Sequence, residues 1–138
     1  MKVNLLAVVV AALSSFLLGG LWYGPLFLTT WQSEAGVTAE QMAAGNPVVI
    51  FGGAFVLALV AAYGMALAVR AVGSHGALSG FRDGLLVGLF FSATTLGINY
   101  LFAHRTPALW ALDAGYAVLM FGLMGAVLGA WPAKKAAD

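Results

Sequence analysis

Asp113 is the only acidic residue that we place inside one of the long apolar runs of the sequence. It lies in the run 108–131, six residues after Pro107, which places it about 9 Å along a helix. A carboxylate beside aromatic rings can bind an organic cation through charge pairing and through attraction to the ring faces. We therefore predict a ligand-binding site from residues that fall near the same ends of three apolar runs: Trp22, Tyr23, Asn99, Tyr100, Asp113 and Tyr116.

The presence of a carboxylate in an apolar run requires an explanation, because a charge at the centre of a bilayer costs about 2.5–3.5 kcal/mol and less near its edge. Three explanations stay open at this point. Asp113 reaches the water, or it is tied to Asn99, Tyr23 or Arg105 as part of the packing, or it binds a ligand.

Other chemistry has little support in the sequence. His75 and His104 fall in different links, and the chain contains no cysteine. We find no paired carboxylates, no Ser-His-Asp set and no metal-binding spacing. We therefore expect no enzymatic activity, no metal and no cofactor, and the formal charge of +1 speaks against a nucleic-acid partner.

The elements that must position these residues follow from composition. The chain is 62% hydrophobic and only 8% charged, whereas a soluble domain carries roughly 25% charged residues. Its apolar residues form four runs of about the 20 residues that cross a hydrocarbon core. We predict a single all-α domain, an integral membrane bundle of four transmembrane helices, with spans at 4–24, 48–69, 84–103 and 108–131.

The first run resembles a secretory signal at its start, because Lys2 precedes apolar residues. It continues past Phe16 to Trp22, beyond the short apolar core of a signal peptide. We expect a retained helix.

The distribution of basic residues predicts the orientation. With four spans, Arg105 falls on one side and the other five on the opposite side, which the positive-inside rule places in the cytoplasm. Both termini are therefore expected to be cytoplasmic. The five basic residues are Lys2, Arg70, Arg82, Lys134 and Lys135.

The segment after the first run should turn onto the outer surface. Trp22 and Tyr23 favour the interface, and Pro25 cannot continue the helical hydrogen bonds. The sequence "TAEQ" at 38–41 fits a capping box, with Gly45 placed to end the helix. We predict a short outer interfacial helix between the first and second spans.

Two further patterns concern packing. Small residues three to four apart, such as Gly84 with Gly88 and Gly125 with Gly129, allow helices to approach closely, within the chain or against a partner. On the last run, Asp113 and Tyr116 share a face with two methionines, roughly opposite the glycines. That second face is expected to contact lipid, a second copy of the chain or a cavity.

A short motif also occurs twice. Ser15-x4-Gly20-x2-Tyr23 in the first run returns as Ser92-x4-Gly97-x2-Tyr100 in the third. Both runs are expected to cross the membrane in the same direction, so the motif is consistent with a parallel internal repeat or with chance.

Three segments resemble the DUF1761 family of small bacterial membrane proteins, whose function is not established. They are "LWYGPLFLTTWQ" at 21–32, "GVTAEQM" at 36–42 and "DAGYAVLMFGLMGAVLGAW" at 113–131. The family often has Gly-Lys where this chain has Thr29 and Thr30, so a basic residue is lost there. The resemblance implies the four-span layout and the bacterial inner membrane, and it supplies no activity.

Two functions remain. The first is binding or transport of a small organic or cationic ligand at the outer site. The second is a membrane scaffold or interaction subunit without transport activity. A small multidrug-resistance-like antiporter is a narrower alternative that fits poorly, because such proteins carry an acidic residue in the first span and this chain has none there. The uneven distribution of basic residues between the two sides disfavours a fluoride-channel-like dimer. Because four helices enclose little volume, we also expect a homodimer.

Overall fold

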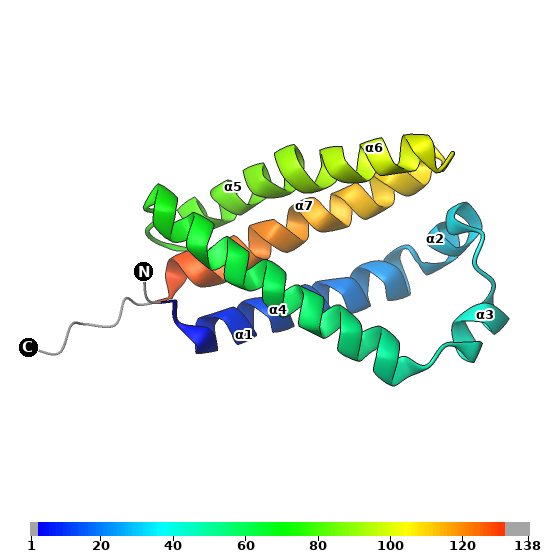
Figure 1. The fold of residues 1–138 in the computed structure, drawn as a ribbon, viewed down its shortest axis with the longest axis horizontal. Coiled ribbons are helices and arrows are strands. Elements are labelled where there is room, and N and C mark those ends of the chain that lie inside the picture. The colour runs from blue at the N-terminus through cyan, green and yellow to red at the C-terminus, as the bar shows by residue number, and fades with distance from the viewer. Residues whose placement is uncertain (1–2, 132–138) are drawn as a thin grey trace, which may run out of the picture.

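The computed structural model describes residues 3–131, and within them the chain is helical, without strands (Figure 1). Two π-helical segments, η1 and η2, interrupt longer helices. In chain order the elements are α1 (Leu5–Leu21), η1 (Trp22–Leu26), α2 (Leu28–Ala35), α3 (Ala39–Ala44), α4 (Pro47–Val72), α5 (Ala77–Val87), η2 (Gly88–Ala93), α6 (Thr94–Phe102) and α7 (Pro107–Ala130).

Four helical stretches are long and apolar enough to cross a membrane, with mean hydropathies between 1.7 and 2.3. The predicted all-α four-helix membrane fold is therefore confirmed. The stretches are Leu5–Leu26, Pro47–Val72, Ala77–Phe102 and Pro107–Ala130.

The third stretch begins earlier than the sequence predicted. It starts at Ala77, not at residue 84, because Ser79, Arg82 and Asp83 interrupt the apolar run without breaking the helix. The link before it is consequently short. Gly73 ends α4 and Gly76 precedes α5, with φ angles of 76° and 94° that favour glycine.

Figure 1 shows α7 between two neighbours: α1 runs along one side of it, and the continuous helix α5–η2–α6 runs along the other. α4 crosses α1 obliquely. We call the end that carries α2 and α3 the α2 end, and the end with the α4–α5 link the link end. Lys2, Lys134 and Lys135, on which the predicted orientation partly depends, lie outside the described residues.

Glycines allow α5 and α7 to touch backbone to backbone. A Cβ at Gly84 would lie 2.0 Å from the carbonyl oxygen of Phe121, and a Cβ at Gly80 would lie 2.0 Å from that of Gly125. Association of helices in lipid depends on such close packing. We call this contact the glycine seam; it consists of Gly80 and Gly84 against Gly122, Gly125 and Gly129, and it continues with Gly88 against Val118.

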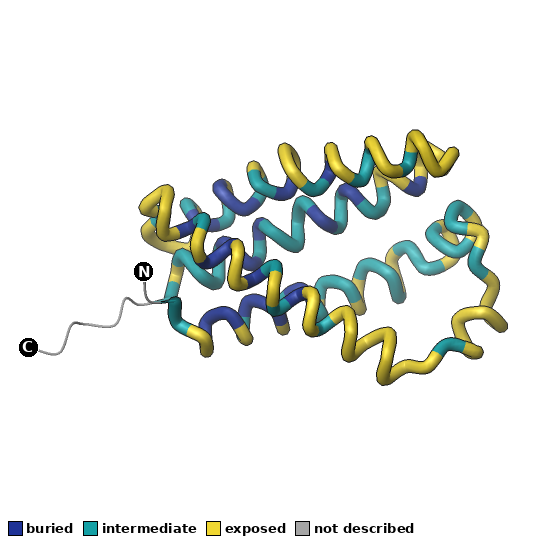
Figure 2. The backbone as a smooth tube through the Cα atoms, in the orientation of Figure 1, coloured by how far each residue is buried: buried dark blue, intermediate teal, exposed yellow. Residues whose placement is uncertain are grey.

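Alanines, two valines and two methionines, Met65 and Met124, fill the centre of the bundle, where α1, α4 and α7 meet. Ala11, Ala12, Ala62 and Met124 are all 0% exposed. Figure 2 shows the buried positions facing inward and the exposed ones facing outward. Many outward residues are large and apolar, Phe102 for example being 84% exposed. So much exposed apolar surface is typical of helices surrounded by lipid.

Aromatic rings and glycines fit reciprocally between α1 and α7. The Trp22 indole covers Gly115, where a Cβ would lie 3.3 Å from Trp22 Cζ2, and the Tyr116 phenol covers Gly19, where a Cβ would lie 3.2 Å from Tyr116 Oη. The predicted second face of α7, with Tyr116 and Met124, is thus occupied by α1 and the core.

Between α1 and α4 the structure has two short helices where one was expected. α3 carries the predicted capping box: the Thr38 hydroxyl accepts from the Gln41 backbone N–H, and the Gln41 side chain accepts from the Thr38 backbone N–H. α2 precedes it and ends at Gly36, whose φ of 68° is left-handed. The Gln32 amide donates to the Met42 sulfur at 3.1 Å and joins the two helices.

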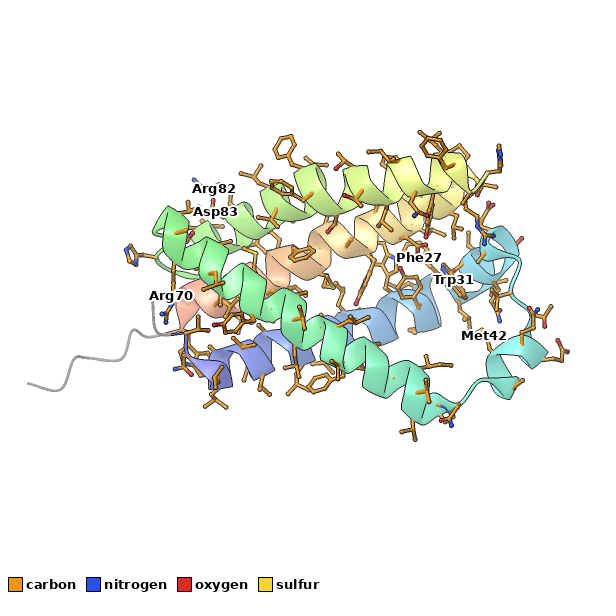
Figure 3. The ribbon with its side chains drawn as sticks, in the orientation of Figure 1. Phe27, Trp31, Met42, Arg70, Arg82 and Asp83 are labelled. Carbon is orange, nitrogen blue, oxygen red and sulfur yellow. The ribbon has the colours of Figure 1, made fainter. Side chains whose placement is uncertain are left out.

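A polar cluster secures the link end. Asp83 accepts a hydrogen bond from the Ser74 hydroxyl, and the Arg82 guanidinium donates twice to Asp83 Oδ1, at 2.9 and 3.0 Å. Figure 3 shows Arg82 and Asp83 near the start of the third stretch, with Arg70 of α4 at the same end of the molecule. The backbone N–H of Gly76 also donates to the carbonyl of Gly129 at 2.8 Å.

Candidate functional site

Asp113 is held by two tyrosines from two other helical stretches. Tyr23 Oη donates to Asp113 Oδ1 at 2.7 Å, and Tyr100 Oη donates to Asp113 Oδ2 at 2.6 Å. We call these three residues the tyrosine clamp. It joins the ends of three spans through one carboxylate, and its two tyrosines are the ones that end the repeated Ser-x4-Gly-x2-Tyr motif.

The first tyrosine is placed by an irregular helix end. Gly24 has φ −104° and ψ −107°, which are non-helical, and Pro25 follows. Because proline lacks the N–H of a helical hydrogen bond, the chain opens into η1 and bends away. Trp22 fixes the bend, since its indole N–H donates to the carbonyl of Leu112 at 3.2 Å.

Aromatic rings form a row on one side of the clamp. The ring centroids of Tyr23 and Tyr116 lie 5.1 Å apart, and those of Tyr23 and Trp31 lie 5.9 Å apart. Both pairs meet edge to face, the favoured arrangement. Figure 3 shows Trp31 and Phe27 where the chain passes from α1 to α2. Tyr116 donates its hydroxyl to the carbonyl of Ser15 at 3.1 Å and not to Asp113.

The second tyrosine follows the other π-helical segment. η2 precedes α6, and the Trp110 indole N–H donates to the carbonyl of Ala93, at the end of η2, at 2.9 Å. A π-helical insertion disturbs the regular hydrogen-bond pattern of a helix. Trp110 therefore ties α7 to the residue where the helix becomes regular again.

We expect Trp110→Phe to loosen η2 while the four helices remain formed. The indole is 39% exposed, so the lost hydrogen bond should cost about 0.5–1.5 kcal/mol. Hydrogen–deuterium exchange should speed up over residues 88–97 and stay unchanged over α4. Unchanged exchange over residues 88–97 would contradict a stabilising role for this bond.

A hollow of about 320 Å³ opens beside the clamp, a volume within the range of small-molecule sites. Three of the six predicted site residues line it, and the sequence missed six others that do. The predicted ones are Asn99, Tyr100 and Asp113, and the missed ones are Trp31, Arg105, Leu109, Ala35, Val37 and Ala103.

The other three predicted residues, Trp22, Tyr23 and Tyr116, do not line the hollow. Tyr23 acts on the site through its bond to Asp113, while Trp22 and Tyr116 donate to backbone carbonyls between α1 and α7. Of the explanations left open for Asp113, the structure shows the tie to Tyr23. Asn99 and Arg105, the other two candidates for that tie, instead line the same hollow as Asp113.

The missed residues come together because α2 folds back onto the link between α6 and α7. Arg105 Nη1 donates to the carbonyl of Ala35 at 3.4 Å, and the Thr106 hydroxyl donates to the Glu34 carboxylate. These bonds bring Trp31 of α2 to the hollow. The sequence could have indicated Trp31 as a site residue, because it lies in the segment 21–32 that resembles the family.

The hollow carries opposite charges that do not pair with each other. Arg105 and Asp113 both line it, yet the salt bridge found within residues 3–131 is the one between Arg82 and Asp83 at the link end. The wall therefore offers a guanidinium, a carboxylate, an amide and aromatic rings to a bound molecule.

A second acidic residue lies in a helix that is long and apolar enough to cross a membrane. Asp83 lies within Ala77–Phe102 and is 9% exposed. The sequence placed it just outside the third span, which was expected to begin at residue 84. Its oxygens already accept from Ser74 and Arg82, so it secures the link end.

One comparison with known proteins identifies a relationship. The family model described as "Protein of unknown function (DUF1761)" matches residues 6–129, which include the clamp and the hollow. Comparisons with curated proteins and with solved structures found no match.

Proposed function

We propose a binding function for this chain, which belongs to the DUF1761 family of proteins of unknown function. In this proposal the hollow at the α2 end takes a small molecule with a cationic group, and Asp113 supplies the counter-charge. Asn99, Tyr100 and Trp31 shape the wall around it.

The observation that carries the proposal is the fixed position of the Asp113 carboxylate. Each of its oxygens accepts one phenol hydrogen bond, and a carboxylate has about four lone-pair sites in total. Acceptor capacity therefore remains for a ligand. Two hydroxyls hold the group in place before binding, which lowers the entropic cost of capturing a cation.

The proposal extends to location. By the positive-inside rule, the hollow would open outward from a bacterial inner membrane, with both termini in the cytoplasm. Binding is supported better than transport by a single copy, because Met124 and the buried alanines fill the bundle between the two ends. Transport would require a second copy, as in the expected homodimer, or a rearrangement.

The scaffold function keeps one supporting observation. The glycine pairs first considered for a partner, Gly84–Gly88 and Gly125–Gly129, belong to the glycine seam inside the chain. On α4, however, a Cβ at Gly52, Gly53 or Gly64 would meet nothing within 4 Å. A discrete partner trapped there by crosslinking in native membranes would favour the scaffold.

To test binding, we would titrate tetramethylammonium into detergent-purified protein and follow tryptophan fluorescence, because Trp31 lines the hollow. We expect saturable binding that Asp113→Asn weakens about tenfold or more, since tenfold corresponds to about 1.4 kcal/mol. Glu40→Gln is the matched control, because it removes an exposed carboxylate at the same end.

A second variant separates binding from folding. Asn99→Trp fills the hollow from an exposed position on its wall and leaves the tyrosine clamp intact. We expect it to weaken binding as Asp113→Asn does, with the unfolding temperature unchanged. Equal affinity in the parent protein and in both variants would contradict the proposed site.

A further inference from the structure

We infer that the molecule bound in the hollow is a compact zwitterion, with its cationic group at Asp113 and its anionic group at Arg105. The inference rests on the proposed function for the cationic end. Arg105 adds the anionic end, because it lines the same hollow.

The first argument is the free capacity of Arg105. A guanidinium has five N–H donors, and the hydrogen bond recorded for this one is a long contact of 3.4 Å from Nη1 to the carbonyl of Ala35. That bond directs the side chain to the last residue of α2 and leaves most donors for a ligand. A carboxylate or phosphate suits this planar group, because two parallel N–H donors can reach two oxygens.

The second argument is the separation of the two charges. Arg105 and Asp113 share a wall without forming a salt bridge, whereas Arg82 and Asp83 at the other end pair at 2.9 Å. A simple cation would be attracted by Asp113 and repelled by Arg105, and a simple anion would meet the reverse. A molecule that carries both charges is attracted at both ends.

The remaining wall limits the size and body of the ligand. A volume of about 320 Å³ suits a small organic molecule. Trp31, Val37 and Leu109 provide apolar contact, while the Asn99 amide provides one donor group and one acceptor. This chemistry is shared by free solutes, such as betaines and amino acids, and by the zwitterionic headgroups of lipids.

The experiment compares a zwitterion with its two halves. Glycine betaine contains a quaternary ammonium and a carboxylate, and tetramethylammonium and acetate each present one of them. We would titrate all three into the purified full-length chain. We expect glycine betaine to bind about tenfold or more tightly than tetramethylammonium, and acetate to bind more weakly than glycine betaine.

Arg105→Gln should remove that advantage. It should weaken glycine betaine to the level of tetramethylammonium, whose own affinity should stay the same or rise because a repelling charge is gone. Arg70→Gln is the matched control, since it removes an exposed arginine at the link end. Thermal unfolding of each variant would establish that it is folded.

The outcomes separate the inference from the proposed function. If tetramethylammonium binds through Asp113 but glycine betaine binds no better, or if Arg105→Gln leaves the difference intact, the zwitterion is wrong and the cation site stands. If tetramethylammonium and glycine betaine both fail to bind in detergent and in nanodiscs, both proposals fail.

A last arm identifies the source of the zwitterion. The titration of glycine betaine would be repeated in nanodiscs of phosphatidylcholine and of phosphatidylglycerol. Weaker binding in phosphatidylcholine alone supports the inference, with a lipid headgroup as the natural occupant. Equal binding in both lipids supports it with a free solute. Loss of the betaine advantage over tetramethylammonium in phosphatidylglycerol would overturn it.

Discussion

Replacing Gly84 by alanine is expected to destabilise the protein by about 1–3 kcal/mol or more, which is the usual cost of overpacking a tight core. The new Cβ would lie 2.0 Å from the carbonyl oxygen of Phe121 and 2.9 Å from the Cα of Gly122. Both are backbone atoms, so α5 and α7 would have to separate. Thermal unfolding in mild detergent should show a clearly lower midpoint than for the parent protein.

Gly64→Ala is the matched control. Gly64 lies in the interior of α4, and a Cβ there would meet nothing within 4 Å. Alanine favours a helix over glycine by about 1 kcal/mol, so the midpoint should stay the same or rise. Equal effects at Gly64 and Gly84 would contradict close contact at the glycine seam.

The second large effect concerns the tyrosine clamp. We expect Tyr23→Phe to cost about 1.5–3 kcal/mol, the range for a hydrogen bond to a charged group. In a chain that already carries Asp113→Ala, the same change should cost much less, because the phenol has lost its acceptor. Tyr100→Phe should behave in the same way, since it donates to the other oxygen of Asp113.

A double-mutant cycle measures this coupling directly. The free energy of unfolding would be determined for the parent, for each single variant and for each pair with Asp113→Ala. Tyr63→Phe is the control, because Tyr63 is an exposed tyrosine on α4 and should not couple to Asp113. Strictly additive effects of Tyr23→Phe and Asp113→Ala would rule out the clamp.

The broad architecture was predictable because it depends on composition. Four apolar runs of membrane length can satisfy their backbone groups as helices, and four such helices were found. The start of the third was not predictable in this way. Arg82 and Asp83 make that segment polar, and Asp83 is satisfied there by hydrogen bonds from Arg82 and Ser74.

The candidate site was predictable in part. Spacing along the runs places Tyr23, Tyr100 and Asp113 near the same ends of their helices, and the structure brings all three together. Trp31 and Arg105 depend on how α2 folds back after the bend at Gly24. Hydrophobic periodicity contains no information about the direction of such a bend.

The small residues were recognised, but their partner was not. A pattern such as Gly84–Gly88 indicates that some backbone comes close, and it is the same for a neighbour in the chain and for a second copy. Here the neighbour is α7, whose Gly122 lies against Gly84 and whose Val118 lies against Gly88. The sequence alone therefore left open a scaffold surface that the fold has already used.

The reciprocal fit between α1 and α7 restricts how the molecule can open. Trp22 sits over Gly115 while Tyr116 sits over Gly19, so each helix carries both a protrusion and a notch. A shift by one helical turn, about 5.4 Å, would have to lift both rings out of their notches at once. Translation along the shared axis is therefore blocked, whereas tilting about the two contacts keeps both rings seated. Any conformational change at this end should therefore be a tilt of α1 relative to α7 and not a displacement along the helix axis.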